Sequence, residues 1–210
     1  MGKGPTAGIL VAAGSSERMG RPKQLLPFGG RAMLLRVLEQ ALASPLVQVV
    51  LVLGYEARKV KEALGVAIWD PRLEVLLNND YTEGMASSIR IGLERIQGRF
   101  PSFMLLFADQ PLLDAFTLEF LLEAFWASEK EICVPLARGK RAHPVIFGSR
   151  FYPSLMALRG DVGGRAILQA HPEEILEVEV PRPDLLLDVD SPEDLERLEE
   201  IRQRVENEMI

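Results

Sequence analysis

One early segment of the sequence carries the residue types that bind phosphate groups. It is "ILVAAGSSERMGRPKQLLPFGG", residues 9–30, in which an apolar run gives way to Gly14, Arg18 and Lys23. Gly14 would let backbone amides approach phosphate oxygens, and the two cations would add positive charge near the same anion. The segment lacks the Gly-Lys-Ser/Thr of a P-loop and the Gly-x-Gly-x-x-Gly of a dinucleotide site. A loop of this composition is an ordinary surface turn about as often as it is a phosphate-binding loop. The assignment therefore depends on further residues elsewhere in the chain.

Two aspartates elsewhere have the positions expected of ligands for a hard cation. Asp109 follows the apolar run 103–108, and Asp190 lies in "DVDSPEDL". A carboxylate at the end of an apolar strand is awkward for packing and suited to Mg²⁺. We predict a short strand over 184–190, which would project Asp188 and Asp190 to the same face. Helix capping or turn formation would also explain either aspartate without a metal.

A cationic, glycine-bearing loop and carboxylates from separate strands together predict phosphoryl or nucleotidyl transfer. Mg²⁺ would screen the phosphate charges while amides and cations stabilise the charge that develops. His143 and His171 are the only histidines, and the sequence has no Ser-His-Asp order or His-Glu-x-x-His motif. A phosphate monoester that attacks an α-phosphorus is already an anion and would need no strong general base.

A third polar segment, "NNDYTEGMASSIRIGL" at 78–93, follows another predicted strand. Asn78 and the segment 84–88 would present amide and hydroxyl groups near a helix N-terminus, which suits a nucleobase or a ribose. The alternative is that Thr82 or Ser87 caps that helix.

These segments become neighbours if the chain folds around a parallel sheet. Apolar runs of strand length alternate with stretches in which apolar residues recur at helical spacing. The predicted strands are 7–13, 47–54, 73–78, 103–108, 131–137, 143–147, 175–180 and 184–190, and the predicted helices are 32–44, 56–64, 85–97, 115–128, 161–170 and 191–209. This alternation predicts a three-layer α/β sandwich with a mostly parallel central sheet. Ligands of such sheets bind beyond the carboxyl ends of the strands, where the three polar segments lie.

The composition indicates a protein that handles small molecules. The net charge of −6 leaves no basic surplus to neutralise a nucleic acid. Cys133 is the single cysteine, so no intramolecular disulfide can form. We see no signal peptide, and no apolar run approaches the ~20 residues of a transmembrane helix. We therefore expect a cytoplasmic monomer with no membrane or nucleic-acid partner.

The early segment closely resembles a long signature of nucleotidyltransferases, L-x-A-G-x-S-x-R-M-G-x-x-K-x-L. Four further segments, "NNDYTEGMASSIRIGL", "FADQPLL", "RAHPVIFGSRFYPSLMALRGDVGGRAIL" and "LLLDVDSPEDL", make the chain similar to the molybdenum cofactor cytidylyltransferase branch of the molybdopterin nucleotidyltransferase (NTP transferase) family. The chain departs from the pattern at Asn79, where Pro is expected, and at Ala86, where Ser is common.

The resemblance implies a Rossmann-like fold and Mg²⁺-dependent transfer of CMP from CTP to the terminal phosphate of molybdopterin. "AAG" at 12–14, in place of the "AGG" of the guanylyl branch, favours CTP. The resemblance implies a catalytic role for Arg18, Lys23 and Asp109. It implies nucleotide contacts for Ala12, Ala13, Gly14, Ser15, Arg18, Lys23, Asn78 and Ser87, metal contacts for Asp109 and Asp190, and acceptor contacts for His143, Asp161 and Arg165.

In this reading residues 1–210 form one nucleotidyltransferase domain. Its NTP-binding half spans about 7–130, its acceptor-binding half about 131–190, and its C-terminal helix 191–209. Two alternatives stay open: transfer from GTP or another NTP to molybdopterin or a sugar phosphate, and a cofactor-binding chaperone for a molybdoenzyme. A transient contact with a molybdoenzyme is expected of the enzyme as well. The presence of both Asp109 and Asp190 favours the enzyme, because a chaperone could dispense with metal-binding carboxylates.

Overall fold

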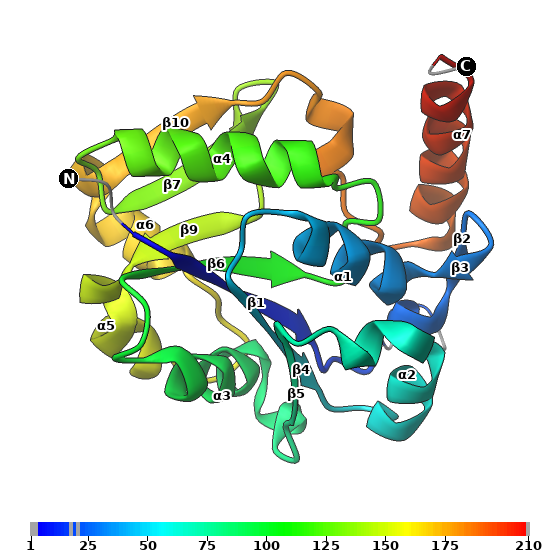
Figure 1. Cartoon of the computed structure of the whole chain (residues 1–210), viewed down its shortest axis with the longest axis horizontal. Coiled ribbons are helices and arrows are strands. Elements are labelled where there is room, and N and C mark those ends of the chain that lie inside the picture. Colours follow the sequence, from blue (N-terminus) through cyan, green and yellow to red (C-terminus); the bar gives the residue numbers. More distant parts are fainter. Residues whose placement is uncertain (1–3, 17–18, 20–21, 209–210) are drawn as a thin grey trace.

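The computed structural model describes residues 4–16, 19 and 22–208, so Arg18 lies outside the described residues. Its centre is an eight-stranded sheet in the order β10-β7-β9-β6-β1-β4-β5, with β8 paired to β7 (Figure 1). Every pairing in this sheet is parallel except those made by β8 and β9. The mostly parallel central sheet predicted from the sequence is confirmed.

The elements agree closely with the predicted ones in the first 140 residues and less closely thereafter. The strands are β1 (Thr6–Ala12), β2 (Pro27–Phe28), β3 (Arg31–Ala32), β4 (Gln48–Leu53), β5 (Leu73–Leu77), β6 (Ser102–Phe107), β7 (Ile132–Ala137), β8 (Lys140–Arg141), β9 (Val145–Gly148) and β10 (Ile175–Glu179). The α-helices are α1 (Met33–Ala43), α2 (Ala57–Ala63), α3 (Met85–Ile96), α4 (Ala115–Ala127), α5 (Tyr152–Met156), α6 (Arg165–Ala170) and α7 (Pro192–Glu208). Short 3₁₀ turns are η2 (Lys23–Leu25), η3 (Gly65–Trp69), η4 (Tyr81–Glu83), η5 (Ser149–Phe151), η6 (Pro172–Glu174) and η7 (Pro183–Leu186).

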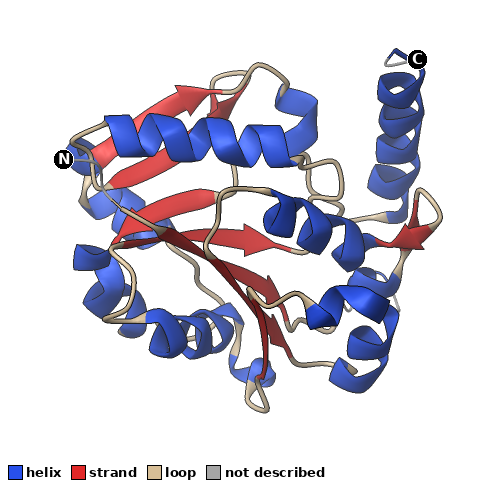
Figure 2. Cartoon of the chain, viewed as in Figure 1, coloured by secondary structure: helices blue, strands red, loops and turns tan. Residues whose placement is uncertain are grey.

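Helices cover both faces of the sheet, which gives the three predicted layers (Figure 2). α1, α2 and α4 share one apolar cluster with the sheet, and α3, α5 and α6 share the other. Gly92 of α3 lies against β1 so closely that a Cβ there would be 2.6 Å from Ile9 Cγ2. This approach brings the N-terminus of α3 close to the carboxyl end of β1.

The strand predicted over 184–190 is wrong. The apolar run begins as the turn η7, in which Leu185 and Leu186 are each 4% exposed, and continues as a loop. These side chains are buried within compact turns instead of pairing along the sheet. The loop is nevertheless tied to the sheet, because Val189 N donates to Asp109 O at 2.8 Å.

α7 begins with Ser191 as its N-cap. Asp194 N donates to Ser191 Oγ at 3.2 Å, and Ser191 N donates to Asp194 Oδ2 at 2.9 Å, which forms a reciprocal capping pair. The helix packs through Leu198 and Ile201 against the hairpin residue Phe28. Within the described part of the chain, no helix is both long and apolar enough to cross a membrane.

Candidate functional site

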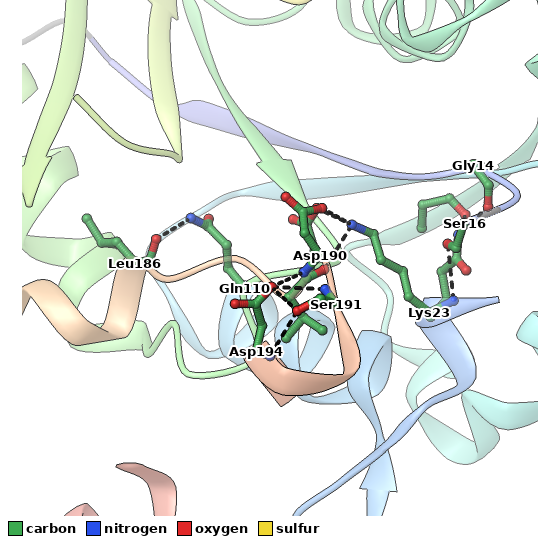
Figure 3. A network of polar contacts seen from close by, with 12 residues as sticks. Gly14, Ser16, Lys23, Gln110, Leu186, Asp190, Ser191 and Asp194 are labelled. Atoms are coloured by element: carbon green, nitrogen blue, oxygen red, sulfur yellow. Dashed lines mark hydrogen bonds and ion pairs between the residues drawn. The ribbon is translucent and has the colours of Figure 1, made fainter. Parts of the chain in front are cut away.

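A lysine and two aspartates from distant parts of the chain meet beyond the carboxyl ends of the central strands. Lys23 Nζ donates to Asp109 Oδ2 at 2.7 Å and to Asp190 Oδ1 at 3.4 Å (Figure 3). It also donates to Val189 O at 3.2 Å. Burial alone would lower the pKa of Lys23, but the two carboxylates raise it, so the ammonium stays charged. The lysine therefore holds the loop around Asp190 against the end of β6.

Negative charge exceeds positive charge among the described residues at this point. Desolvation and the charges of Asp109 and Asp190 raise the pKa of Asp188 to about 6. Three carboxylates thus surround one described lysine. The surplus negative charge would favour the binding of a further cation. No group of three His, Cys, Asp or Glu within the described ranges could hold a metal by itself. Mg²⁺ is commonly held by one or two carboxylates together with substrate phosphates, and Asp109 and Asp190 suit that mode.

The loop after β1 is held in shape by a residue that the sequence analysis missed. Gln24 Nε2 donates to Ala12 O and to Gly14 O, both at 2.9 Å. Lys23 N donates to Ser16 Oγ at 3.2 Å, and Ser16 itself turns the chain with a φ of 56°. A Cβ on Gly14 would have no heavy atom within 4 Å, so this part of the loop is open. Open backbone beside a charged lysine is suited to phosphate oxygens.

A cavity of about 380 Å³ lies over this loop. Its walls include five of the residues expected to contact nucleotide: Ala12, Ala13, Gly14, Ser15 and Lys23. Tyr81, Thr82, Gly84 and Ser88 line it from the N-terminal side of α3. We call it the smaller cavity.

Two expected nucleotide contacts, Asn78 and Ser87, lie behind this wall. They are 0% and 3% exposed, and Asn78 Nδ2 donates to Ser87 Oγ at 2.8 Å and to Ser88 Oγ at 2.9 Å. Ser87 Oγ in turn donates a hydrogen bond to Gly84 O at 2.8 Å. These side chains tie β5 to α3 and support the cavity from within, whereas their neighbour Ser88 reaches its surface.

A cavity of about 670 Å³, the larger cavity, adjoins the smaller one on the side of β9. His143 and Arg165 line it, together with Arg141, Gln169, Asp188 and Asp190. Burial lowers the pKa of His143 despite the nearby charge of Asp109, so the imidazole is neutral at pH 7. Its ring lies edge-on to Phe107, with centroids 4.7 Å apart.

The third expected acceptor residue, Asp161, lines the smaller cavity instead. Its Oδ1 accepts a hydrogen bond from Met85 N at 3.3 Å, at the start of α3. The helix predicted over 161–170 begins only at Arg165, since residues 161–164 form a loop over α3. Gly84 allows this packing: a Cβ there would lie 2.4 Å from Gly160 C.

The two cavities share Met85, Phe107 and Asp109 as wall residues. Asp109 therefore lies where a molecule in one cavity would meet a molecule in the other. One side offers open loop backbone and a lysine, and the other offers two arginines and a neutral histidine. This arrangement can bring two anionic molecules together at a carboxylate pair that suits a divalent cation.

The sequence pattern of the MobA-like NTP transferase domain matches residues 8–175. Among curated proteins, the chain is 28% identical over 199 residues to nicotine blue oxidoreductase from Paenarthrobacter nicotinovorans, covering 91% of this chain and 95% of that protein. It is 26% identical over 190 residues to molybdenum cofactor cytidylyltransferase from Escherichia coli, covering 89% and 91%.

Among solved structures, the chain is similar to the Rv0371C complex with manganese from Mycobacterium tuberculosis. The TM-score is 0.77 with 28% sequence identity, covering 94% of this chain and 99% of that one. A homologue of that protein from Mycobacterium sp. strain JC1 has a TM-score of 0.82 with 27% identity, covering 95% and 98%. The resemblance of the sequence to the NTP transferase family is confirmed, as is the Rossmann-like nucleotidyltransferase fold.

Proposed function

Because the chain belongs to the MobA-like NTP transferase family, we propose that this nucleotidyltransferase moves CMP from CTP to the terminal phosphate of molybdopterin. The products would be molybdopterin cytosine dinucleotide and pyrophosphate. The observation that carries the proposal is that two cavities of unlike chemistry adjoin at Asp109. A transfer between two phosphate-bearing molecules needs this adjacency, because both must reach the same reacting phosphorus.

The smaller cavity is the side proposed for CTP. Phosphate oxygens would accept hydrogen bonds from the backbone of 14–16, and Lys23 would offset the charge that develops on the leaving pyrophosphate. Ala12 and Ala13 line this cavity, whose volume of about 380 Å³ lies within the range of small-molecule sites. Arg18, proposed as a second triphosphate contact, lies outside the described residues.

Asp109 and Asp190 are the residues proposed to hold Mg²⁺. Their carboxylates lie within hydrogen-bonding distance of the same Lys23 nitrogen, and their charges add to desolvation in raising the pKa of the neighbouring Asp188. A bound divalent ion would neutralise triphosphate charge at the position that these aspartates flank. The similarity to a structure that is a manganese complex supports a divalent metal in this family.

The larger cavity is the side proposed for molybdopterin. Arg165 and Arg141 would pair with the acceptor phosphate, and His143 would contact its uncharged part. The acceptor phosphate oxygen would attack the α-phosphorus of CTP, forming one P–O bond as the bond to pyrophosphate breaks. The attacking oxygen is already anionic, so the neutral His143 need not take a proton.

We infer that residues 1–210 act as one domain in a cytoplasmic monomer that meets a molybdoenzyme only transiently. The shared cavity walls support a single domain, because residues from both halves of the chain line each cavity. The single cysteine supports a reducing compartment, where no disulfide is required.

The test is a nucleotide panel with molybdopterin as acceptor. The protein is incubated with CTP, GTP, UTP or ATP and Mg²⁺, and pyrophosphate release and product mass are measured with and without molybdopterin. We expect acceptor-dependent release with CTP and the mass of the cytosine dinucleotide. Release with GTP alone would overturn the choice of nucleotide, and release with sugar phosphates instead would overturn the choice of acceptor. Tight molybdopterin binding with no release from any nucleotide would favour the chaperone alternative.

A further inference from the structure

Four arginines line a cavity beside η7 and α7. The cavity has a volume of about 450 Å³, and residues of the C-terminal helix α7 and of the turns before it line its walls. We call it the arginine cavity. Its lining residues are Arg138, Pro181, Arg182, Pro183, Asp184, Leu185, Arg197, Ile201 and Arg204. None of them lines either of the cavities described above.

The cavity is built from an apolar base and a cationic rim. Leu185 and Ile201 are 4% and 7% exposed and pack in the same apolar cluster, which joins η7 to α7. Arg197 and Arg204 are seven residues apart on α7, so they project from one face of the helix. Arg182 lies between two prolines, whose fixed φ angles restrict the backbone that carries it. The backbone that carries the rim is therefore anchored to the apolar base.

The positive charge of the rim is only partly neutralised by described residues. Arg138 Nη2 lies 2.7 Å from Asp184 Oδ1, and Arg182 Nη1 lies 3.6 Å from Asp114 Oδ2. Arg197 contributes to the lowered pKa of Asp194 by its charge, but it makes no hydrogen bond or close ion pair with any residue that the structure describes. Arg204 likewise makes no hydrogen bond or close ion pair with any described residue. This surplus stands out on a chain whose net charge is −6.

We propose that the arginine cavity binds a small ligand carrying two or more phosphate groups. Guanidinium groups match phosphate oxygens in a bidentate geometry, and several of them on one rim select for more than one phosphate. A volume of about 450 Å³ lies within the range of small-molecule sites. A concave site favours a compact ligand over an acidic protein segment, which would suit an extended surface.

The arginine cavity is connected to the proposed active site through a short stretch of chain. Residues 187–190, which carry Asp188 and Asp190, connect the two elements that form the walls of the arginine cavity. A ligand that bridges Arg182 on one wall and Arg197 on the other would hold these elements together. The binding site itself does not depend on the proposed function.

The test measures binding of inorganic pyrophosphate to the full chain by calorimetry at low ionic strength without metal. The test variant is Arg197→Gln/Arg204→Gln, and both residues are exposed, so we expect an unchanged thermal midpoint without ligand. The matched control, Arg58→Gln/Lys61→Gln, removes the same charge from the exposed face of α2. Lys23→Gln reports separately on pyrophosphate bound at the proposed active site.

We expect a binding event of equal affinity in the natural chain, in the control variant and in Lys23→Gln, because this event lies at the arginine cavity. In Arg197→Gln/Arg204→Gln its affinity should fall at least tenfold. Any event that Lys23→Gln alone removes belongs to the proposed active site. Orthophosphate should bind the cavity more weakly than pyrophosphate. Binding to the test variant that equals binding to the control would overturn the proposal. Tighter binding of an oligoglutamate peptide than of pyrophosphate would overturn the choice of a small ligand.

Discussion

The two cavities that adjoin at Asp109 are built in different ways. The smaller cavity takes its walls from the ends of the parallel strands β1 and β6 and from the start of α3. The larger cavity takes its walls from the antiparallel strand β9, the loop before α6 and the segment that carries Asp188 and Asp190. One is built around the ends of parallel strands, and the other around the antiparallel strands β8 and β9 together with loop segments far apart in sequence.

In the proposed reaction, the smaller cavity would hold the phosphate groups of the nucleotide, and the larger cavity would vary with the acceptor. Irregular segments can change their side chains without disturbing the sheet. The chain is 28% and 26% identical to relatives with the unlike names of an oxidoreductase and a cytidylyltransferase. Such diversity is what a constant framework with a variable second cavity would permit.

Asp109→Asn tests the wall that both cavities share. The change removes a proposed metal ligand and the charge partner of Lys23 Nζ, which lies 2.7 Å away. We expect nucleotidyl transfer to fall about 10³-fold, equivalent to about 4 kcal/mol of transition-state stabilisation. The measurement is kcat for pyrophosphate release at saturating CTP and Mg²⁺.

The control for this variant is Glu119→Gln, which removes one negative charge from the exposed face of α4. It should keep full activity. Equal activity of Asp109→Asn and Glu119→Gln, with both folded by circular dichroism, would contradict the role of Asp109.

Gly84→Ala tests the contact that joins the two halves. A Cβ at this position would lie 2.4 Å from Gly160 C, and the φ of Gly84 is +100°. Backbone must therefore move, and we expect a loss of about 3 kcal/mol in the free energy of unfolding. For a chain of this size that corresponds to roughly 6–12 °C in the thermal midpoint.

Gly98→Ala is the matched control, because Gly98 also has a positive φ but a Cβ there would meet nothing within 4 Å. It should cost about 1 kcal/mol, the conformational penalty alone. Similar losses in the two variants would mean that the contact with residue 160 contributes nothing to stability.

The parallel half could be predicted from the sequence for a simple physical reason. Strands buried on both faces need continuous apolar runs, and β1, β4 and β6 begin and end within one residue of those runs. Asp109 was identifiable because a carboxylate at the end of such a run has no packing role. The direction of β9 could not be predicted, since apolar content does not distinguish parallel from antiparallel neighbours.

The errors arose where a local pattern has two structural solutions. The leucines of 184–187 suit a buried turn as well as a strand, and only the position of α7 decides between them. Asn78 and Ser87 are a different case: their groups could bind either a ligand or each other, the structure shows them bonded to each other, and their contact with a nucleotide stays a prediction. The short helix α5 has too few residues for a periodic signal.

Tyr152→Phe tests the packing on the β9 side of the sheet. Tyr152 is 3% exposed, donates to Phe100 O at 3.2 Å, and burial raises its pKa to about 12. Below pH 10 the phenol is protonated in both the folded and the unfolded chain. Between about pH 10 and 12 it ionises only in the unfolded chain, so its contribution to stability falls by about 2 kcal/mol. Urea unfolding should therefore find Tyr152→Phe about 1 kcal/mol less stable than the natural chain at pH 8, the value of the lost hydrogen bond, and about 1 kcal/mol more stable than it at pH 12. A constant difference across this range would contradict the burial of the phenol.

A pair of variants sharpens the comparison between the cavities most directly. Ser15 lines only the smaller cavity, and Arg165 lines only the larger one. If the first holds the nucleotide and the second the acceptor, Ser15→Ala should raise KM for CTP and Arg165→Gln should raise KM for molybdopterin. Each effect should be about tenfold, the value of one hydrogen bond to a charged group, with the other KM unchanged. A rise in both KM values from either variant would mean that one cavity holds parts of both substrates, and the division between a constant and a variable cavity would fail.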